Sequence, residues 1–161
     1  MTPRTPPALH ALAACQAVLA PGAIAGGAAL AWRPDGSVMG LPVSLLAGTP
    51  FPDFLAPGLI LGLAIGLGSA VAAAGLWTRP EWRWLRPLQD ATQVHWAWTL
   101  AFLEGVALLV WLAVQLFVAS VPFTGFHVFY GLLGLVILAL CFAPGVRARL
   151  ARPRPRALQA G

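Results

Sequence analysis

Three polar side chains stand out because each lies inside a long apolar segment. Glu104 is the only acidic residue in such a segment, and Gln16 and Ser69 lie in two others. At the helical rise of about 1.5 Å per residue, Glu104 lies roughly 13 Å, and Gln16 and Ser69 each roughly 12 Å, from the same end of their segments. These positions predict one polar layer in which the three side chains hydrogen-bond to one another across three helices.

The chemistry expected of this layer follows from the cost of a charge in lipid. A buried carboxylate is unfavourable there, and protonation of Glu104 is the usual way to avoid it. Two interpretations stay open. The carboxyl group binds a proton or a ligand, or it donates a hydrogen bond that holds neighbouring helices together. No basic partner for Glu104 is found in the apolar segments.

A second polar set is expected near the opposite end of the same helices. Gln115 follows Glu104 by eleven residues, about three helical turns, and so lies on the same helix face. His127 and Tyr130 come early in the next apolar segment. Polar groups at both levels suit a hydrated path, whereas ordinary polarity near the lipid headgroups explains them equally simply.

Metal and cofactor chemistry find little support in the sequence. The two cysteines, Cys15 and Cys141, lie in different apolar segments and form no C-x-x-C motif. The three histidines are too dispersed for a zinc site. We therefore predict no metal and no cofactor, and no catalytic residue is assigned.

The elements that must position these side chains are long hydrophobic helices. Hydrophobic residues make up 59% of the 161 residues and charged residues 9%, far below the charge content of soluble domains. Apolar segments of about 17 to 25 residues match a hydrocarbon core of ~30 Å. The predicted fold is all-α, an integral membrane four-helix bundle forming a single domain over residues 1–161. The predicted spans cover residues 8–31, 57–77, 95–119 and 126–142.

Arginine placement predicts the orientation of the bundle. All ten basic residues are arginine, and Arg33 alone falls on the opposite side from the others if both termini are cytoplasmic. The C-terminal arginines are expected to contact anionic lipid headgroups: Arg147, Arg149, Arg152, Arg154 and Arg156. The net charge of +5 then reflects topology and lipid contact, and no nucleic acid partner is expected. The composition, rich in Ala, Gly, Pro, Leu and Arg, indicates a bacterial inner-membrane protein.

The segments between the predicted spans carry local signals. The periplasmic loop 32–56 contains a turn at Asp35-Gly36-Ser37, a short helix that opens at Pro42, and a capping residue, Asp53. This loop is expected to cover the outer mouth of the bundle, either as a surface connector or as a lid. The basic, proline-rich segment 144–161 is expected to be a flexible tail.

Small residues recur at every fourth position of the second span, at Gly58, Gly62, Gly66, Ala70 and Ala74. Such a ridge lets another helix approach closely. It predicts either tight packing within the bundle or a homo-oligomer face.

Three segments resemble a group of small four-span bacterial membrane proteins of unassigned activity. They are Gly40-Leu-Pro-Val-Ser-Leu-Leu, Pro50-Phe-Pro-Asp-Phe-Leu-Ala-Pro-Gly-Leu-Ile-Leu and His95-Trp-Ala-Trp-Thr. The likeness extends from about Leu12 to Arg149. It implies four spans and transfers no functional residue.

The sequence favours a non-enzymatic helix bundle that acts as an accessory or structural membrane component. One alternative is a proton-coupled transporter or channel subunit that uses Glu104. The other is a small membrane enzyme or a lipophile-binding protein whose first loop serves as a lid.

Overall fold

The computed structural model describes residues 6–119 and 121–151, and all its regular elements are helical. An isolated bridge between Val94 and Ala151 is the β-type pairing found in this part of the chain. The long elements are α1 (Pro7–Trp32), α2 (Leu55–Leu59), the π-helix η3 (Ile60–Leu67), α3 (Gly68–Thr78), α5 (Trp96–Phe117) and α6 (Gly125–Cys141). The short ones are the 3₁₀ turns η1 (Ser37–Met39), η2 (Val43–Leu46) and η4 (Arg83–Leu85), with helices α4 (Arg86–Thr92) and α7 (Pro144–Leu150).

The long helices coincide with the predicted apolar segments to within two residues at each end. Elements α2, η3 and α3 run on as one helix over Leu55–Thr78. Among the described residues, three helices are long and apolar enough to cross a membrane: Pro7–Trp32, Leu55–Thr78 and Trp96–Phe117. A fourth crossing results if α6 and α7, which meet at a bend of 60°, count as one broken span.

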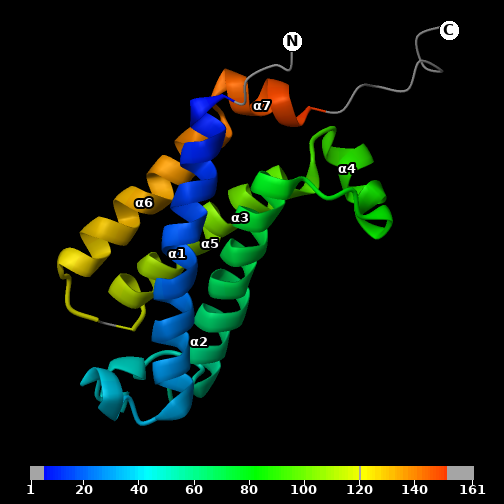
Figure 1. Ribbon diagram of the computed structural model, residues 1–161. Helices are drawn as coiled ribbons and strands as arrows, with labels where there is room; N and C mark the ends of the chain where they lie inside the picture. Colours follow the sequence, from blue (N-terminus) through cyan, green and yellow to red (C-terminus); the bar gives the residue numbers. More distant parts are fainter. Residues whose placement is uncertain (1–5, 120, 152–161) are drawn as a thin grey trace, which may run out of the picture.

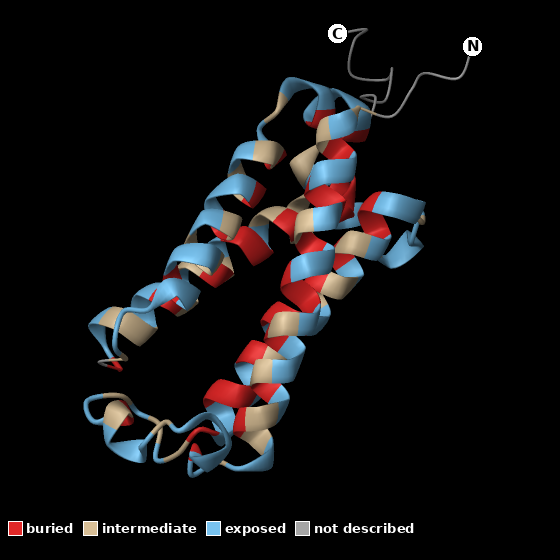
Figure 2. Ribbon diagram, turned by 60° about the vertical axis from the view of Figure 1, so that its left-hand side comes forward, coloured by how far each residue is buried: buried red, intermediate tan, exposed pale blue. Residues whose placement is uncertain are grey.

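The long helices pack side by side so that each contacts two neighbours (Figure 1). Helix α1 contacts η3, α3 and α6, whereas α5 contacts α3 and α6. Buried residues face the interior of this arrangement and exposed ones face outward (Figure 2). Many exposed residues are large and apolar, including Leu63, Leu103 and Leu132, which are all more than half exposed. An outer surface of this kind fits a lipid environment.

The two ends of the helices differ. At the end that we call the loop end, residues 33–54 lie near the connection between α5 and α6 (Figure 1). Helices α4 and α7 lie at the opposite end, which we call the α7 end.

The closest packing in the fold joins α1 to the second long helix. A Cβ atom on Gly27 would lie 2.6 Å from the Gly58 carbonyl oxygen and would also meet the Gly62 backbone. A Cβ on Gly58 would lie 2.8 Å from the Ala31 nitrogen. The two backbones therefore touch, and these glycines are required by the contact.

The π-helix explains why the four-residue spacing of glycines stays on one face. In an α-helix, residues four apart drift by about 40° around the axis. A π-helix has wider turns, so residues four apart drift in the opposite direction. The two drifts offset each other across the junction of α2 and η3, and Gly58, Gly62 and Gly66 all face α1. Beyond Leu67 the α-helical period resumes.

The predicted ridge therefore ends early. Ala70 is only half-buried and Ala74 is exposed, whereas Ser69, Ala72 and Leu76 are the buried positions of α3. The prediction of a continuous ridge was wrong at its last two members because the helix changes its period inside the span.

The chain after Pro144 also differs from the expectation. Instead of a flexible tail, Pro144–Leu150 forms α7, and Val146 and Leu150 are buried. The His95 N–H donates to the Leu150 carbonyl at 2.8 Å. Two apolar side chains at helical spacing and this hydrogen bond anchor the segment. Residues 152–161 of the predicted tail lie outside the described residues.

Gly27→Leu tests the backbone contact between α1 and the second long helix. The added side chain meets backbone atoms that cannot move away, so the free energy of unfolding should fall by about 3 kcal/mol, the upper part of the usual range for overpacking. Unfolding in detergent measures this loss. Ala28→Leu, one residue further on the exposed face of α1, should leave stability nearly unchanged. Equal stability of both variants would contradict the contact.

Candidate functional site

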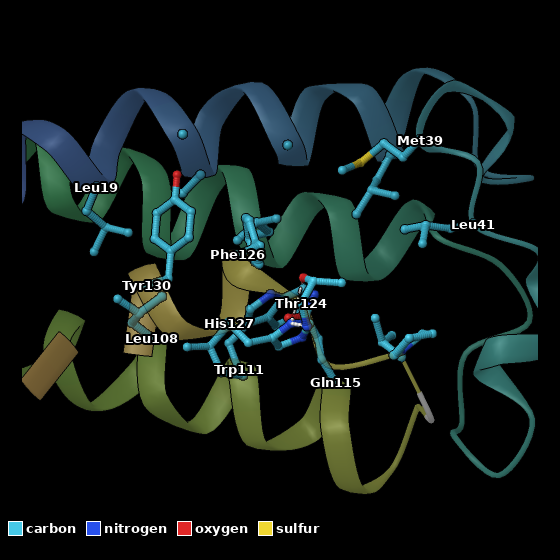
Figure 3. A pocket seen from close by; sticks show the side chains of 18 residues that line it. Leu19, Met39, Leu41, Leu108, Trp111, Gln115, Thr124, Phe126, His127 and Tyr130 are labelled. Carbon is cyan, nitrogen blue, oxygen red and sulfur yellow. Dashed lines mark hydrogen bonds between the residues drawn. The ribbon is translucent and has the colours of Figure 1, made fainter. Parts of the chain in front are cut away.

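A cavity of about 330 Å³ lies among the long helices at the loop end. Its volume is at the lower end of the range of small-molecule pockets. Figure 3 shows side chains from α1, α5, α6 and the first loop around it. The apolar wall is formed by Leu19, Ala23, Leu30, Met39, Leu41, Leu61, Leu108, Leu112 and Val121, and no charged side chain is among the lining residues in the described part of the chain.

The polar side chains of the cavity come from two helices. On α5, the lining residues Leu108, Trp111, Leu112 and Gln115 are three or four positions apart and so share one face. On α6, His127 lies in the first turn. The predicted set of Gln115, His127 and Tyr130 thus lines a single cavity, although the sequence placed these residues at an interface and predicted no cavity.

Thr124 orients the imidazole ring of His127, with its side-chain oxygen and its backbone nitrogen each 3.2 Å from Nδ1. The backbone N–H of Thr124 donates to His127 Nδ1 at 3.2 Å, and the Thr124 side chain in turn caps the backbone of His127, in a capping box. A ring nitrogen that accepts a hydrogen bond carries no proton. The proton of the neutral imidazole is therefore on Nε2.

Three polar atoms of the lining have no hydrogen-bond partner among the residues that the structure describes. His127 Nε2, Trp111 Nε1 and Gln115 Oε1 are all buried and unpaired, and His127 is only 6% exposed. Figure 3 shows the three side chains grouped beside Thr124. Burying a polar group without a partner costs roughly 1–3 kcal/mol. Three such groups on neighbouring side chains make this part of the wall polar and incompletely hydrogen-bonded.

Aromatic rings form another part of the wall. The rings of Phe126 and Tyr130 lie 4.5 Å apart between centroids. The Tyr130 hydroxyl reaches α1 at Gly22, where a Cβ would collide with it. Glycine at this position therefore makes room for the phenol.

The first loop closes the loop end of the cavity. Met39 and Leu41 line it, and Phe54, near the end of the loop, is buried. Gly36 has a φ of 75°, and a Cβ there would lie 2.9 Å from the Phe54 ring. Asp35 holds the turn by accepting from the Ser37 hydroxyl at 2.7 Å. The Ser37 backbone N–H donates to the same carboxyl group, and the two hydrogen bonds hold the pKa of the exposed Asp35 below its usual range.

The local predictions for this loop are confirmed in part. The Asp35-Gly36-Ser37 segment forms a turn. Asp53 accepts from the N–H of Leu55, the first residue of α2, at 2.9 Å, but the N-cap itself is Phe54, so Asp53 lies one residue outside the predicted capping position. The short helix expected after Pro42 is a 3₁₀ turn, Val43–Leu46.

The predicted layer of Glu104, Gln16 and Ser69 is buried, but it is not a hydrogen-bonded layer. The Gln16 side chain donates to the Ala101 carbonyl of α5 at 3.0 Å. Gln16 Oε1, Ser69 Oγ and Glu104 Oε2 have no partner. The expectation of mutual hydrogen bonds among the three was wrong, because a backbone carbonyl lies within reach of Gln16.

Glu104 instead packs against α3. A Cβ on Gly68 would lie 2.7 Å from the Glu104 Cδ atom and would collide with Oε1. Glu104 does not line the cavity, whose lining on α5 begins one turn further at Leu108. The continuous polar path considered from the spacing of Glu104 and Gln115 is therefore interrupted by Leu108 and Leu112, which are buried apolar residues.

Sequence reasoning missed Trp111 and Thr124. A signal for Thr124 was present, since Thr-x-x-His at the start of an apolar segment places a capping residue three positions before a side chain that can bond back to it. Trp111 precedes Gln115 by one helical turn. A tryptophan in the middle of an apolar segment is usually interpreted as a packing residue. The polar residue one turn further along is the signal that it also belongs to a polar cluster.

Gly68→Ala tests the contact of Glu104. The added methyl displaces the carboxyl group, so it should cost about 1–3 kcal/mol of stability with Glu104 present. With Glu104→Ala in the same chain the cost should largely disappear, which gives a coupling energy of roughly 1 kcal/mol or more. Unfolding of the two single variants and the double variant measures it. Strictly additive losses would show that the two residues do not touch.

Comparison with known proteins finds no match for this chain among protein-family models, curated proteins or solved structures.

Proposed function

We propose that the chain is a non-enzymatic, multi-pass protein of the bacterial inner membrane that holds an uncharged lipophile in the cavity at the loop end. In this proposal α6 provides a fourth span and both termini are cytoplasmic. The single observation that carries the binding function is the cavity of about 330 Å³, whose described lining is mostly apolar and includes no charged side chain.

The distribution of charge supports the orientation. Arg79, Arg83 and Arg86 belong to the connection between α3 and α5 at the α7 end (Figure 1). Arg147 and Arg149 are exposed on α7. Arg33 follows α1 at the loop end. Arginines gathered at one end are typical of the cytoplasmic side, which puts the cavity in the periplasmic half of the protein.

The exposed arginines of α7 suit a second contact, with anionic lipid headgroups. Val146 and Leu150 anchor the helix on the protein, whereas Arg147 and Arg149 are exposed, and the Arg147 guanidinium lies 5.9 Å from the centroid of the Trp98 ring. Each arginine near an anionic surface contributes about 1 kcal/mol. Arg152, Arg154 and Arg156, which belong to the same prediction, lie outside the described residues.

Several features support a lipophile as the occupant. The wall is mostly leucine and aromatic side chains, and no described lining residue is charged. Met39 and Phe126 line the cavity and are each about half exposed, so the cavity has an open rim. A charged headgroup would be left without a counter-ion among these residues, whereas an uncharged lipophile would bury apolar area and satisfy the polar atoms.

Ala23→Leu tests lipophile binding by filling the cavity. Ala23 lines the cavity and is buried, so the larger side chain occupies the space of the ligand. Mass spectrometry of organic extracts should find a neutral lipophile bound to the purified wild-type protein and several-fold less of it on this variant. Ala25→Leu, on the exposed face of the same helix, is the matched control and should retain it. A lipid profile identical in all three proteins would argue against a binding function.

A further inference from the structure

We propose that a second pocket, at the α7 end, binds the phosphate group of an anionic phospholipid. The pocket has a volume of about 220 Å³ and lies between the first turns of α1 and the end of α3, two helices in contact (Figure 1). It is lined by Leu9, His10, Ala13, Leu76, Trp77 and Arg79. This inference goes beyond the proposed function, because it concerns a different ligand at the opposite end of the helices.

The accessible wall of this pocket is formed mainly by the three side chains that carry N–H groups. The aliphatic residues of the lining are each at most 5% exposed, so they contribute little open surface. His10 and Trp77 are exposed, and Arg79 is half-buried. Polar atoms are accordingly as prominent as apolar atoms on this wall, in contrast to the mostly apolar cavity at the loop end.

These three side chains are the kind that recognise a phosphate. The Arg79 guanidinium carries a permanent charge and a planar fork of N–H groups that matches two phosphate oxygens. The imidazole of His10 and the indole of Trp77 each provide an N–H group, and their rings lie edge to face with centroids 5.9 Å apart. No acidic residue lines the pocket in the described part of the chain, so an anion meets donors without a competing carboxylate.

The charge of Arg79 is available to a ligand. Within residues 6–119 and 121–151 it forms no ion pair, and Oε1 of Glu81, the nearest acidic residue in the sequence, lies 4.0 Å from His95 Nε2. Arg79 ends α3 in a left-handed conformation with a φ of 49°, which favours glycine. Because glycine would suit this backbone better, the role of Arg79 lies in its side chain.

The position of the pocket indicates a lipid as the source of the phosphate. Its volume is below the usual range of pockets for whole small molecules, so it suits a single headgroup. Trp77 is 70% exposed at the end of a span, where indole rings favour the headgroup level. One turn further into the membrane, His10 is followed by Ala14 and Trp77 is preceded by Ala73, and neither alanine is buried. These small side chains leave room for the acyl chains beside the two helices.

The test measures how phospholipids stabilise the full chain in detergent. Thermal unfolding with added phosphatidylglycerol, and with phosphatidylcholine of the same acyl chains, gives each affinity from the concentration dependence of Tm. Inorganic phosphate, as a third probe, separates a lipid headgroup from free phosphate. We expect phosphatidylglycerol to bind at least about tenfold more tightly than phosphatidylcholine, whose choline cation opposes Arg79, and inorganic phosphate to have little effect.

The variants separate a defined site from general attraction by positive charge. Arg79→Gly removes the guanidinium and suits the left-handed backbone, so without lipid it should be about as stable as the wild type. It should bind phosphatidylglycerol roughly tenfold more weakly. Arg79→Lys keeps the charge but loses the fork, and its affinity should fall between the two. Arg86→Ala removes the same charge from an exposed arginine of the same connection, outside the pocket, and should bind like the wild type.

Three outcomes would overturn the inference. Equal affinity for both phospholipids would show that the pocket does not select an anionic lipid. An equal loss in Arg79→Gly and Arg86→Ala would show that charge attracts the lipid without a defined site. Stabilisation by inorganic phosphate as strong as by phosphatidylglycerol would identify free phosphate as the ligand.

Ala23→Leu keeps this inference distinct from the proposed function. Because it fills the cavity at the loop end, it should leave the affinity for phosphatidylglycerol unchanged. If Ala23→Leu abolishes the stabilisation by phosphatidylglycerol and Arg79→Gly does not, the phospholipid occupies the cavity and the inference fails, while a binding function of the cavity stands.

Discussion

The backbone contact between α1 and the second long helix is the constraint on which the rest of the structure depends. Gly27 lies against Gly58 and Gly62, and a Cβ atom on Gly27 or on Gly58 would collide with the backbone of the other helix. Helices in lipid gain little hydrophobic energy from association, so contacts of this closeness are a main source of cohesion. The same glycine-rich part of α1 presents Gly22 and Gly26 to the cavity. One short segment thus provides both the tightest packing of the fold and the space beside it.

Buried polar groups differ between the level of Glu104 and the level of the cavity. The Gln16 amide donates to the Ala101 carbonyl and so links α1 to α5, and Glu104 packs on Gly68 away from the cavity. These residues fit the structural role that the sequence left open. At the loop end, Trp111, Gln115 and His127 line one cavity, and one buried polar atom of each has no hydrogen-bond partner among the described residues. Unpaired groups are more costly in a low-dielectric interior than in water, so this level of the bundle is the less well satisfied of the two.

Much of the helical framework could be predicted, because long uncharged segments with charged or proline-rich flanks are strong signals. The two polar clusters were predicted from the positions of their residues along the helix axes. Position along the axis does not determine how a helix is rotated about that axis, and so does not determine which neighbour a side chain faces. After the π-helix at Ile60–Leu67, Ala72 is buried together with Ser69, whereas Ala70 and Ala74 of the predicted ridge are half-buried and exposed. The cavity depends on side-chain volumes from α1, the first loop, α5 and α6 together, which no single segment reveals. Helix α7 was missed because its proline and arginines outweighed the spacing of Val146 and Leu150.

The proposed binding function depends on what fills the cavity at the loop end. A crystal structure of protein purified without delipidating treatment, and grown from a lipidic phase, shows this content. We expect non-protein density in the cavity among α1, α5 and α6. An empty cavity, or one filled by rearranged side chains, would exclude the binding function.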